Sequence, residues 1–136
     1  MEYRQLGGSD VNVSAVTLGT WAIGGWMWGG TDEQAAIAAI QAAIDAGMTS
    51  IDTAPMYGMG LSEEIVGKAV AGRRDRVQLL TKYGMRWDLA EGKHWFDTKT
   101  PEGQDVKVHL CAKAHSVIEE CERSLKRLRT DCIDVY

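Results

Sequence analysis

The sequence predicts an α/β fold that amounts to one half of a (β/α)8 barrel, preceded by a short β-hairpin. Short apolar segments alternate with helical segments, a pattern typical of a parallel sheet with right-handed crossovers. The strands carry apolar runs, as parallel strands covered on both faces do. The 136 residues provide about four strands, whereas the closed barrel has eight strands and ~250 residues. A flavodoxin-like sheet is the alternative, but it would normally add a fifth strand and a final covering helix.

The N-terminal third of the chain predicts a hairpin, a strand and a helix. Extended segments at Tyr3–Leu6 and Val11–Ser14 flank a Gly-Gly-Ser-Asp turn, which indicates the hairpin. The segment AVTLG then predicts a separate buried strand. A helix follows over TDEQAAIAAIQAAIDAG, where Thr31 and Gln34 fit a capping box and the final glycine fits a helix stop. The buried face of this helix is predicted to contain Ile37, Ile40 and Ile44.

The rest of the chain continues the alternation of strands and helices. MTSID and RVQLLTK predict the next two strands, and SEEIVGKAVAG between them predicts a helix capped by Ser62 and ended near Gly72. Residues 83–112 hold no regular period and therefore predict a long loop, of the kind that is usually functional or mobile. The helix SVIEECERSLKRL and the apolar strand DCIDVY complete the chain. The buried stripe of that helix is predicted to comprise Ile118, Cys121, Leu125 and Leu128.

Composition argues against several classes of protein. The net charge is −4 with both signs interspersed, so nothing resembles the basic surface of a nucleic-acid-binding protein. The N-terminus lacks a signal-peptide pattern and no apolar run approaches the ~20 residues of a membrane span, so we expect a cytoplasmic protein without membrane contact. Three cysteines without a Cys-x-x-Cys pair argue against a disulfide framework. His109, Cys111 and His115 are close in sequence, but no fourth ligand is evident, and we expect no metal site.

Three polar side chains are predicted to meet at one face of the sheet, because catalytic groups of such barrels lie at the C-terminal ends of the strands. Asp52 ends the second strand, Lys82 ends the third, and Tyr57 lies in the loop after the second. A phenol is a reluctant proton donor at neutral pH, and a nearby ammonium stabilises the phenolate form. With Asp52 holding the lysine, the trio would form a general acid for carbonyl reduction. The plainer alternative is an ion pair at the barrel rim beside a tyrosine that packs.

Five segments of the sequence resemble the aldo-keto reductase family. They are LGTWAIGG, IDTAPMYG, SEEIVGKAV, LLTKYG and SLKRLRTDCIDVY, and they follow the family's order along nearly the whole chain. The resemblance implies that residues 1–136 form the N-terminal half of the family's (β/α)8 barrel. Residues 1–14 would be the hairpin that closes the bottom of the barrel, and residues 83–112 would be a loop on its top face.

The resemblance also implies an activity, which is hydride transfer between NADP(H) and a small-molecule aldehyde or ketone. Tyr57 would be the proton donor, Lys82 would make its phenol more acidic, and Asp52 would pair with Lys82. The residues beside the cofactor and the substrate would be Gly19, Thr20, Trp21 and, at the nicotinamide ribose, Asp52.

One departure from the family's pattern is large. The family's fourth catalytic residue is a histidine just after the fourth strand, and this sequence ends at Tyr136, where that segment would begin. His94, His109 and His115 precede the last helix and do not match that position. The later loops, which in the family hold the nicotinamide and the adenosine 2′-phosphate, are not in the sequence either. The resemblance therefore implies an active parent enzyme and an inactive, truncated 136-residue chain.

Two other functions fit the sequence. The open edges of half a barrel would pair with a second copy or with a C-terminal half, which would make the chain a non-catalytic assembly module. Lys82 at a strand end also permits a Schiff-base enzyme such as an isomerase. Among the tryptophans, Trp21 is expected to wall an apolar substrate pocket, and the glycine-flanked Trp26 and Trp28 predict a mobile flap.

Overall fold

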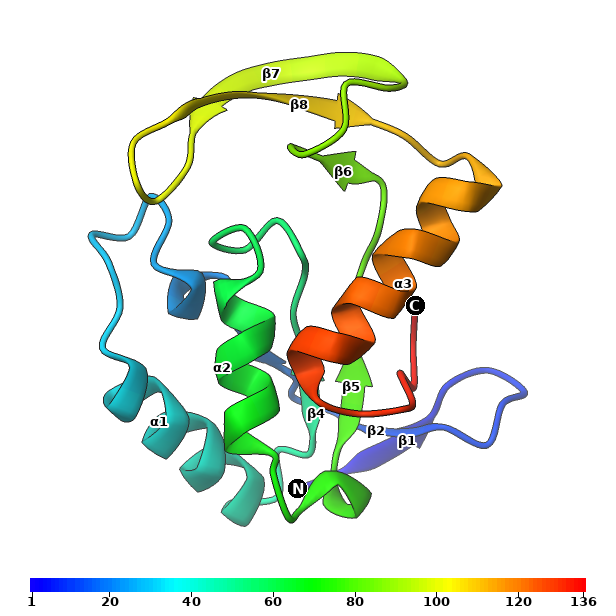
Figure 1. The fold of residues 1–136 in the computed structure, drawn as a ribbon. Coiled ribbons are helices and arrows are strands. Elements are labelled where there is room, and N and C mark those ends of the chain that lie inside the picture. The colour runs from blue at the N-terminus through cyan, green and yellow to red at the C-terminus, as the bar shows by residue number, and fades with distance from the viewer.

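Three main helices cover one face of a central parallel sheet, and an antiparallel sheet lies across the top of it (Figure 1). The structure is a computed structural model and describes residues 1–136. No helix is both long and apolar enough to cross a membrane. The helices are α1 (Glu33–Asp45), α2 (Leu61–Ala69) and α3 (Ala114–Leu128), with short 3-10 helices η1 (Ala22–Gly24) and η2 (Arg74–Arg76).

The central sheet has the strand order β3-β4-β5, so each strand lies beside its predecessor in the sequence. Its members are β3 (Leu18–Gly19), β4 (Ser50–Asp52) and β5 (Gln78–Leu80). Where the sequence predicts a fourth strand, Val135 forms a parallel bridge to Leu80. Sequential parallel order is that of a barrel wall, whereas the flavodoxin-like sheet reverses its order at a switch point. The strand order thus matches the predicted half barrel.

The N-terminal hairpin lies at the start of the parallel strands. Strand β1 (Tyr3–Gln5) pairs antiparallel with β2 (Asn12–Ser14). The Ser14 amide donates to Ser50 Oγ at 2.8 Å, and the Ser50 amide donates to Ser14 Oγ at 3.0 Å. Ser50 is the first residue of β4, so the hairpin sits at the end of the sheet opposite Asp52, the last residue of that strand.

The hydrophobic core fills the space between the central sheet and its helices. The α1 stripe contributes Ile40 and Ile44, which pack with Ile51 and Leu79 of the sheet and are almost wholly buried. Gly67 lets α2 approach the end of α3, because a Cβ at this position would lie only 2.6 Å from a backbone oxygen of α3. The predicted isoleucine stripe is confirmed, although Ile37 is only partly buried at its edge.

Both predicted N-caps differ from the structure. Helix α1 is capped by Asp32 in place of Thr31, because Asp32 is the last residue with an extended backbone and its carboxylate accepts from the Ala35 amide at 3.0 Å. Helix α2 begins after Gly60, whose backbone is left-handed (φ +102°). Ser62 is the second residue inside α2 and is fully buried. Its hydroxyl is used by the functional site described below.

Helix α3 presents a different face from the one that its apolar spacing predicts. Ile118 is 60% exposed, and only Leu128 of the predicted stripe is fully buried. The inward face carries hydroxyl and carboxylate groups that find partners there. The Glu120 carboxylate accepts from the Gly84 amide at 2.9 Å, which links the helix to the chain after β5. The buried residues of α3 are Ser116, Glu120, Ser124 and Leu128. The spacing of apolar residues does not predict this buried face of α3, because polar contacts determine which face of the helix turns inward.

The segment 83–112, predicted as a loop, contains a three-stranded antiparallel sheet with the order β6-β8-β7. The strands are β6 (Met85–Arg86), β7 (Lys93–Lys99) and β8 (Asp105–Leu110). Two features conceal them in the sequence. Most of the residues of β7 are exposed, so few apolar positions mark a buried face. The pairing also shifts between His94 and Phe96, which breaks the period of two that identifies a strand.

A buried ion pair holds α3 against α2, and its loss should destabilise the fold. The Arg127 Nε donates to the wholly buried Glu63 carboxylate at 2.6 Å, and Thr81 Oγ1 donates to its other oxygen at 2.6 Å. Arg127→Met would leave that charge without its ionic partner. We expect the free energy of unfolding to fall by about 3 kcal/mol, the low end for such losses, because Arg127 is 19% exposed. Chemical denaturation measures this free energy of unfolding. Lys126→Met, at an exposed neighbouring position, is the control, and equal stability of the two variants would contradict the prediction.

Candidate active site

The C-terminal ends of the three parallel strands bring the predicted residues together. Gly19 is paired with Asp52, and Asp52 with Leu80, so the strands end side by side. Lys82 follows two residues beyond the end of β5. Tyr57 lies in the loop between β4 and α2. Parallel strands end at one edge of a sheet, which explains how residues 25 or more positions apart reach one site.

Lys82 is held by two acceptors beside Tyr57. Its Nζ donates to Asp52 Oδ1 at 2.7 Å and to the Thr53 carbonyl oxygen at 2.9 Å. The same Nζ lies 4.9 Å from the centroid of the Tyr57 ring, within the range of a cation–π contact. The side chains of Lys82 and Asp52 remain 47% and 34% exposed. A fixed ammonium therefore stands next to a phenol at a place that a substrate can reach.

Tyr57 is positioned by the turn that follows β3. Its ring stacks on Trp21, with centroids 6.1 Å apart and an interplanar angle of 25°. Trp28 in turn meets the edge of Trp21 at a centroid distance of 5.9 Å. Gly58 follows Tyr57 with a positive φ of +65°, and a Cβ there would lie 2.1 Å from the Gly24 carbonyl oxygen. The loop that carries Tyr57 is thus pressed against η1, and only glycine allows this approach.

Ser62 connects the strand ends beneath the site. Its Oγ donates to Thr20, with 2.7 Å to Thr20 Oγ1 and 2.9 Å to the Thr20 carbonyl oxygen, and lies 3.1 Å from Thr53 Oγ1. Thr20 Oγ1 donates to the Asp52 carbonyl oxygen at 2.9 Å. All three hydroxyl-bearing residues are fully buried. These hydroxyl groups link Thr20, which precedes Trp21, to Thr53, whose carbonyl oxygen accepts from Lys82. This role of Ser62 is not evident from the sequence, because a serine at this position also fits a helix N-cap.

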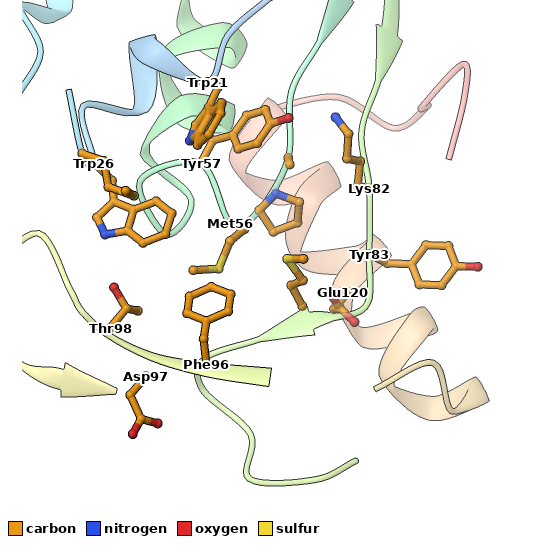
Figure 2. A pocket seen from close by; sticks show the side chains of 14 residues that line it. Trp21, Trp26, Met56, Tyr57, Lys82, Tyr83, Phe96, Asp97, Thr98 and Glu120 are labelled. Carbon is orange, nitrogen blue, oxygen red and sulfur yellow. The ribbon is translucent and has the colours of Figure 1, made fainter. Parts of the chain in front are cut away.

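An open cleft of about 640 Å³ adjoins Tyr57 and Lys82. Figure 2 shows Trp21, Tyr57 and Lys82 along one side of it, and Phe96 opposite them. Nine of its 14 lining residues are hydrophobic, so the cleft favours an apolar ligand. Trp21 lines the cleft as the sequence predicts. Residues of β7 also line the cleft. The sequence does not predict this lining, because residues 83–112 were expected to form a loop.

A buried carboxyl group lies at the edge of the cleft. Glu120 is 4% exposed, and burial raises its pKa above the ordinary value, while bonds from the Gly84 amide and Ser116 Oγ oppose this rise. Both of its carboxylate oxygens are occupied, at 2.9 Å from the Gly84 nitrogen and 3.2 Å from Ser116 Oγ. Gly84 follows Lys82 by two residues, so Glu120 helps to fix the chain that carries the lysine.

The residues predicted to contact a cofactor differ in accessibility. Gly19 and Trp21 are exposed, and Asp52 is partly exposed, so these three present surface at the rim that the C-terminal ends of β3 and β4 form. Of the three, only Trp21 lines the cleft. A Cβ built on Gly19 would meet nothing within 4 Å, which leaves open space for a bound group. Thr20 is wholly buried and its hydroxyl is bonded within the protein, so its side chain holds the rim in place and does not face a ligand.

The histidines lie away from this rim. His94 Nε2 is 2.7 Å from Asp97 Oδ1 on β7, and His115 Nε2 is 2.9 Å from Glu91 Oε2. His109 lies on β8 and meets the edge of the His94 ring. Cys111 is buried, and the chain has no group of three or more residues that could hold a metal ion. Cys111 itself lies between the end of β8 at Leu110 and the start of α3 at Ala114.

Known proteins resemble this chain along nearly its whole length. The model of the aldo/keto reductase family matches residues 15–136. The whole chain is 46% identical to the aldo-keto reductase YhdN of Bacillus subtilis, of which it covers 37%. It is 40% identical to the NADH-specific methylglyoxal reductase of Escherichia coli, again over the whole chain and 41% of that protein. The chain thus spans about two fifths of the length of these curated relatives.

Solved structures show the same fold. The glycerol dehydrogenase AKR11B4 of Gluconobacter oxydans has a TM-score of 0.75 and 41% identity, over 96% of this chain and 37% of that one. An aldo/keto reductase of Klebsiella pneumoniae in complex with NADP and acetate has a TM-score of 0.61 and 35% identity, over 91% of this chain and 34% of that one. The chain thus has the fold of about a third of each of these longer proteins.

Proposed function

Because the chain belongs to the aldo/keto reductase family, we propose that the complete protein reduces an aldehyde or ketone to an alcohol with NADPH. The observation that carries this proposal is the Lys82 ammonium, bonded to Asp52 at 2.7 Å and lying 4.9 Å from the Tyr57 ring. The NADP complex of the Klebsiella pneumoniae relative supports the choice of cofactor.

Each side chain has a role in this proposal. NADPH, when bound, supplies the hydride for the carbonyl carbon. Tyr57 donates the proton to the carbonyl oxygen, so that the carbonyl group gains a hydride and a proton and becomes an alcohol. Lys82 stabilises the phenolate that is left on Tyr57, and Asp52 holds Lys82 in place through the 2.7 Å bond. Gly19, Trp21 and Asp52 would hold the nicotinamide end of the cofactor.

The alternatives from the sequence have less support. A Schiff-base enzyme needs Lys82 as a free amine nucleophile. Here its Nζ donates to both Asp52 and the Thr53 carbonyl oxygen, as a charged lysine does. An assembly module would not need contacts among Tyr57, Trp21 and Lys82. In this structure the Tyr57 ring stacks on Trp21 and lies beside Lys82, which favours the reductase.

Turnover with labelled cofactor tests the proposal. The protein expressed from its complete reading frame is given benzaldehyde or acetaldehyde and NADPH carrying deuterium at the transferable position of the nicotinamide. We expect cofactor oxidation with at least one aldehyde, and deuterium on the carbinol carbon of the alcohol. NADH in a parallel assay measures cofactor preference. Failure to oxidise either cofactor with both aldehydes would reject the proposed activity.

A further inference from the structure

The wall of the cleft opposite the catalytic side chains comes from the β7–β8 hairpin. Figure 2 shows the Phe96 ring pointing into the cleft, with Met56 between it and the side that carries Tyr57. The next residue, Asp97, has its carboxylate turned away from the ring of Phe96, and that carboxylate is 2.7 Å from His94 Nε2. The hairpin lines the cleft with Phe96, Asp97 and Thr98, and of these only Phe96 offers an aromatic face.

A β-bulge gives Phe96 this orientation. The pairing of β7 with β8 shifts by one residue after His94, so that Phe96 pairs with Val108 and Trp95 is left without a partner. Directly paired residues of antiparallel strands lie on the same face of a sheet. Val108 is wholly buried, so Phe96 shares the inward face. Without the shift Phe96 would pair with Lys107, whose side chain is exposed. Bulges that re-aim a side chain are over-represented beside active sites.

The hairpin is anchored to the body of the protein. Strand β8 pairs with β6, and the Cys111 amide donates to the Gly84 carbonyl oxygen at 2.9 Å. Arg86 on β6 is 2% exposed and binds the Asp88 carboxylate through two bonds of 2.8 and 3.0 Å. Its remaining nitrogen donates to Ser116 Oγ of α3 at 2.8 Å. This network sets the position of Phe96 relative to Lys82, because both segments are joined to α3 through residues 84–86.

The size and chemistry of the cleft define the ligand that fits it. A three-carbon carbonyl compound displaces roughly four waters, or about 120 Å³, whereas the cleft measures about 640 Å³. The lining includes the thioether groups of Met56 and Met85 and the ring of Phe96, together with the polar side chains of Asp97 and Thr98. Thioether and aromatic groups pack well against a flat apolar ring. Glu120 also reaches the cleft, but both of its carboxylate oxygens are already bonded.

We propose that the bulge at Trp95 makes Phe96 a specificity residue, which selects carbonyl substrates whose substituent is an aromatic ring over short aliphatic ones. The reacting carbonyl lies at Tyr57, and the ring of the substrate extends across Met56 to Phe96. This inference rests on the proposed reductase activity. It adds to that activity a substrate class and a residue on the hairpin that connects β5 to α3.

Paired substrates measure this selectivity. In the protein expressed from its complete reading frame, kcat/KM is determined for benzaldehyde and for acetaldehyde. We expect Phe96→Ala to lower kcat/KM for benzaldehyde by about 10–100-fold, mainly through KM, and to change that for acetaldehyde by less than about threefold. Tyr3→Ala removes an aromatic ring from the N-terminal hairpin, at the opposite end of the central sheet, where Tyr3 is 51% exposed. It should leave both values unchanged.

The outcomes separate this inference from the proposed function. If kcat/KM of Phe96→Ala falls equally for both aldehydes, Phe96 has a structural role and does not select the substrate. That result would overturn this inference but not the proposed function. Absence of turnover of both aldehydes by the unaltered protein would overturn the proposed function, and the inference with it. If Phe96→Ala fails to fold, Phe96→Leu decides, because leucine keeps an apolar side chain but removes the flat face. It should lower the benzaldehyde to acetaldehyde ratio of kcat/KM at least threefold, and an unchanged ratio would overturn the inference.

Discussion

Tyr57→Phe is expected to lower kcat of the complete protein by about 10²–10⁴-fold, the contribution of a positioned acid or base. Phenylalanine keeps the ring that stacks on Trp21 at 6.1 Å and removes only the hydroxyl. The affinity for NADPH should therefore change by less than about threefold. Steady-state kinetics and a fluorescence titration with NADPH measure the two quantities. A variant with normal kcat would remove Tyr57 from the mechanism.

Tyr83 offers a matched control for this substitution. It is the residue after Lys82, and its ring packs on Tyr136 with centroids 5.0 Å apart. Figure 2 shows that its hydroxyl points away from Tyr57. Tyr83→Phe removes the same group from another tyrosine that lines the cleft, so we expect kcat to stay within about twofold. A comparable loss in both variants would mean that phenol groups near the cleft support structure rather than proton transfer.

Lys82→Met is expected to lower kcat by about 10²–10³-fold, because it removes the charge that stabilises the phenolate in the transition state. Methionine keeps most of the length of the side chain. The Asp52 carboxylate then loses its partner at 2.7 Å, but it is 34% exposed and water can solvate it. The free energy of unfolding should therefore fall by no more than about 1 kcal/mol. Rates in the presence of saturating NADPH and denaturation curves test both parts.

Lys99→Met is the control that removes a lysine charge outside the cleft. It shows whether the effect of Lys82→Met depends on the position of the charge. Lys99 pairs with Asp105 at 2.6 Å on the β7–β8 hairpin, and both side chains are more than 60% exposed. The pair resembles that of Lys82 and Asp52 in distance but lies outside the cleft. We expect Lys99→Met to leave kcat unchanged within about twofold. If Lys82→Met were equally mild, the proposal that a lysine tunes Tyr57 would be wrong.

Together these variants assign different tasks to neighbouring parts of one cleft. Tyr57 and Lys82 are expected to control kcat, and Phe96 is expected to control KM for aromatic substrates. The buried hydroxyl groups of Ser62, Thr20 and Thr53 hold the strand ends at which the first two residues meet. This division places the reaction on the parallel strands and substrate choice on the antiparallel hairpin.

The sequence by itself determined the alternation of strands and helices, the α1 core stripe and the family. It also predicted that Asp52, Tyr57 and Lys82 share one face. These predictions rest on local properties, since hydrophobic period and strand direction can be read along a single segment. The family resemblance in turn depends on short motifs, such as IDTAPMYG, that are contiguous in the chain.

Only the tertiary structure decided the features that depend on partners distant in sequence. Ser62 lies inside α2 because its hydroxyl reaches Thr20, 42 residues earlier. Helix α3 turns Ser116 and Glu120 inward because Arg86 and Gly84 meet them there, so its apolar spacing indicates the wrong face. Phe96 enters the cleft because its strand shifts register against β8. In each case a hydrogen bond or a pairing between segments outweighs the local pattern, and such partners are known only when the chain is folded.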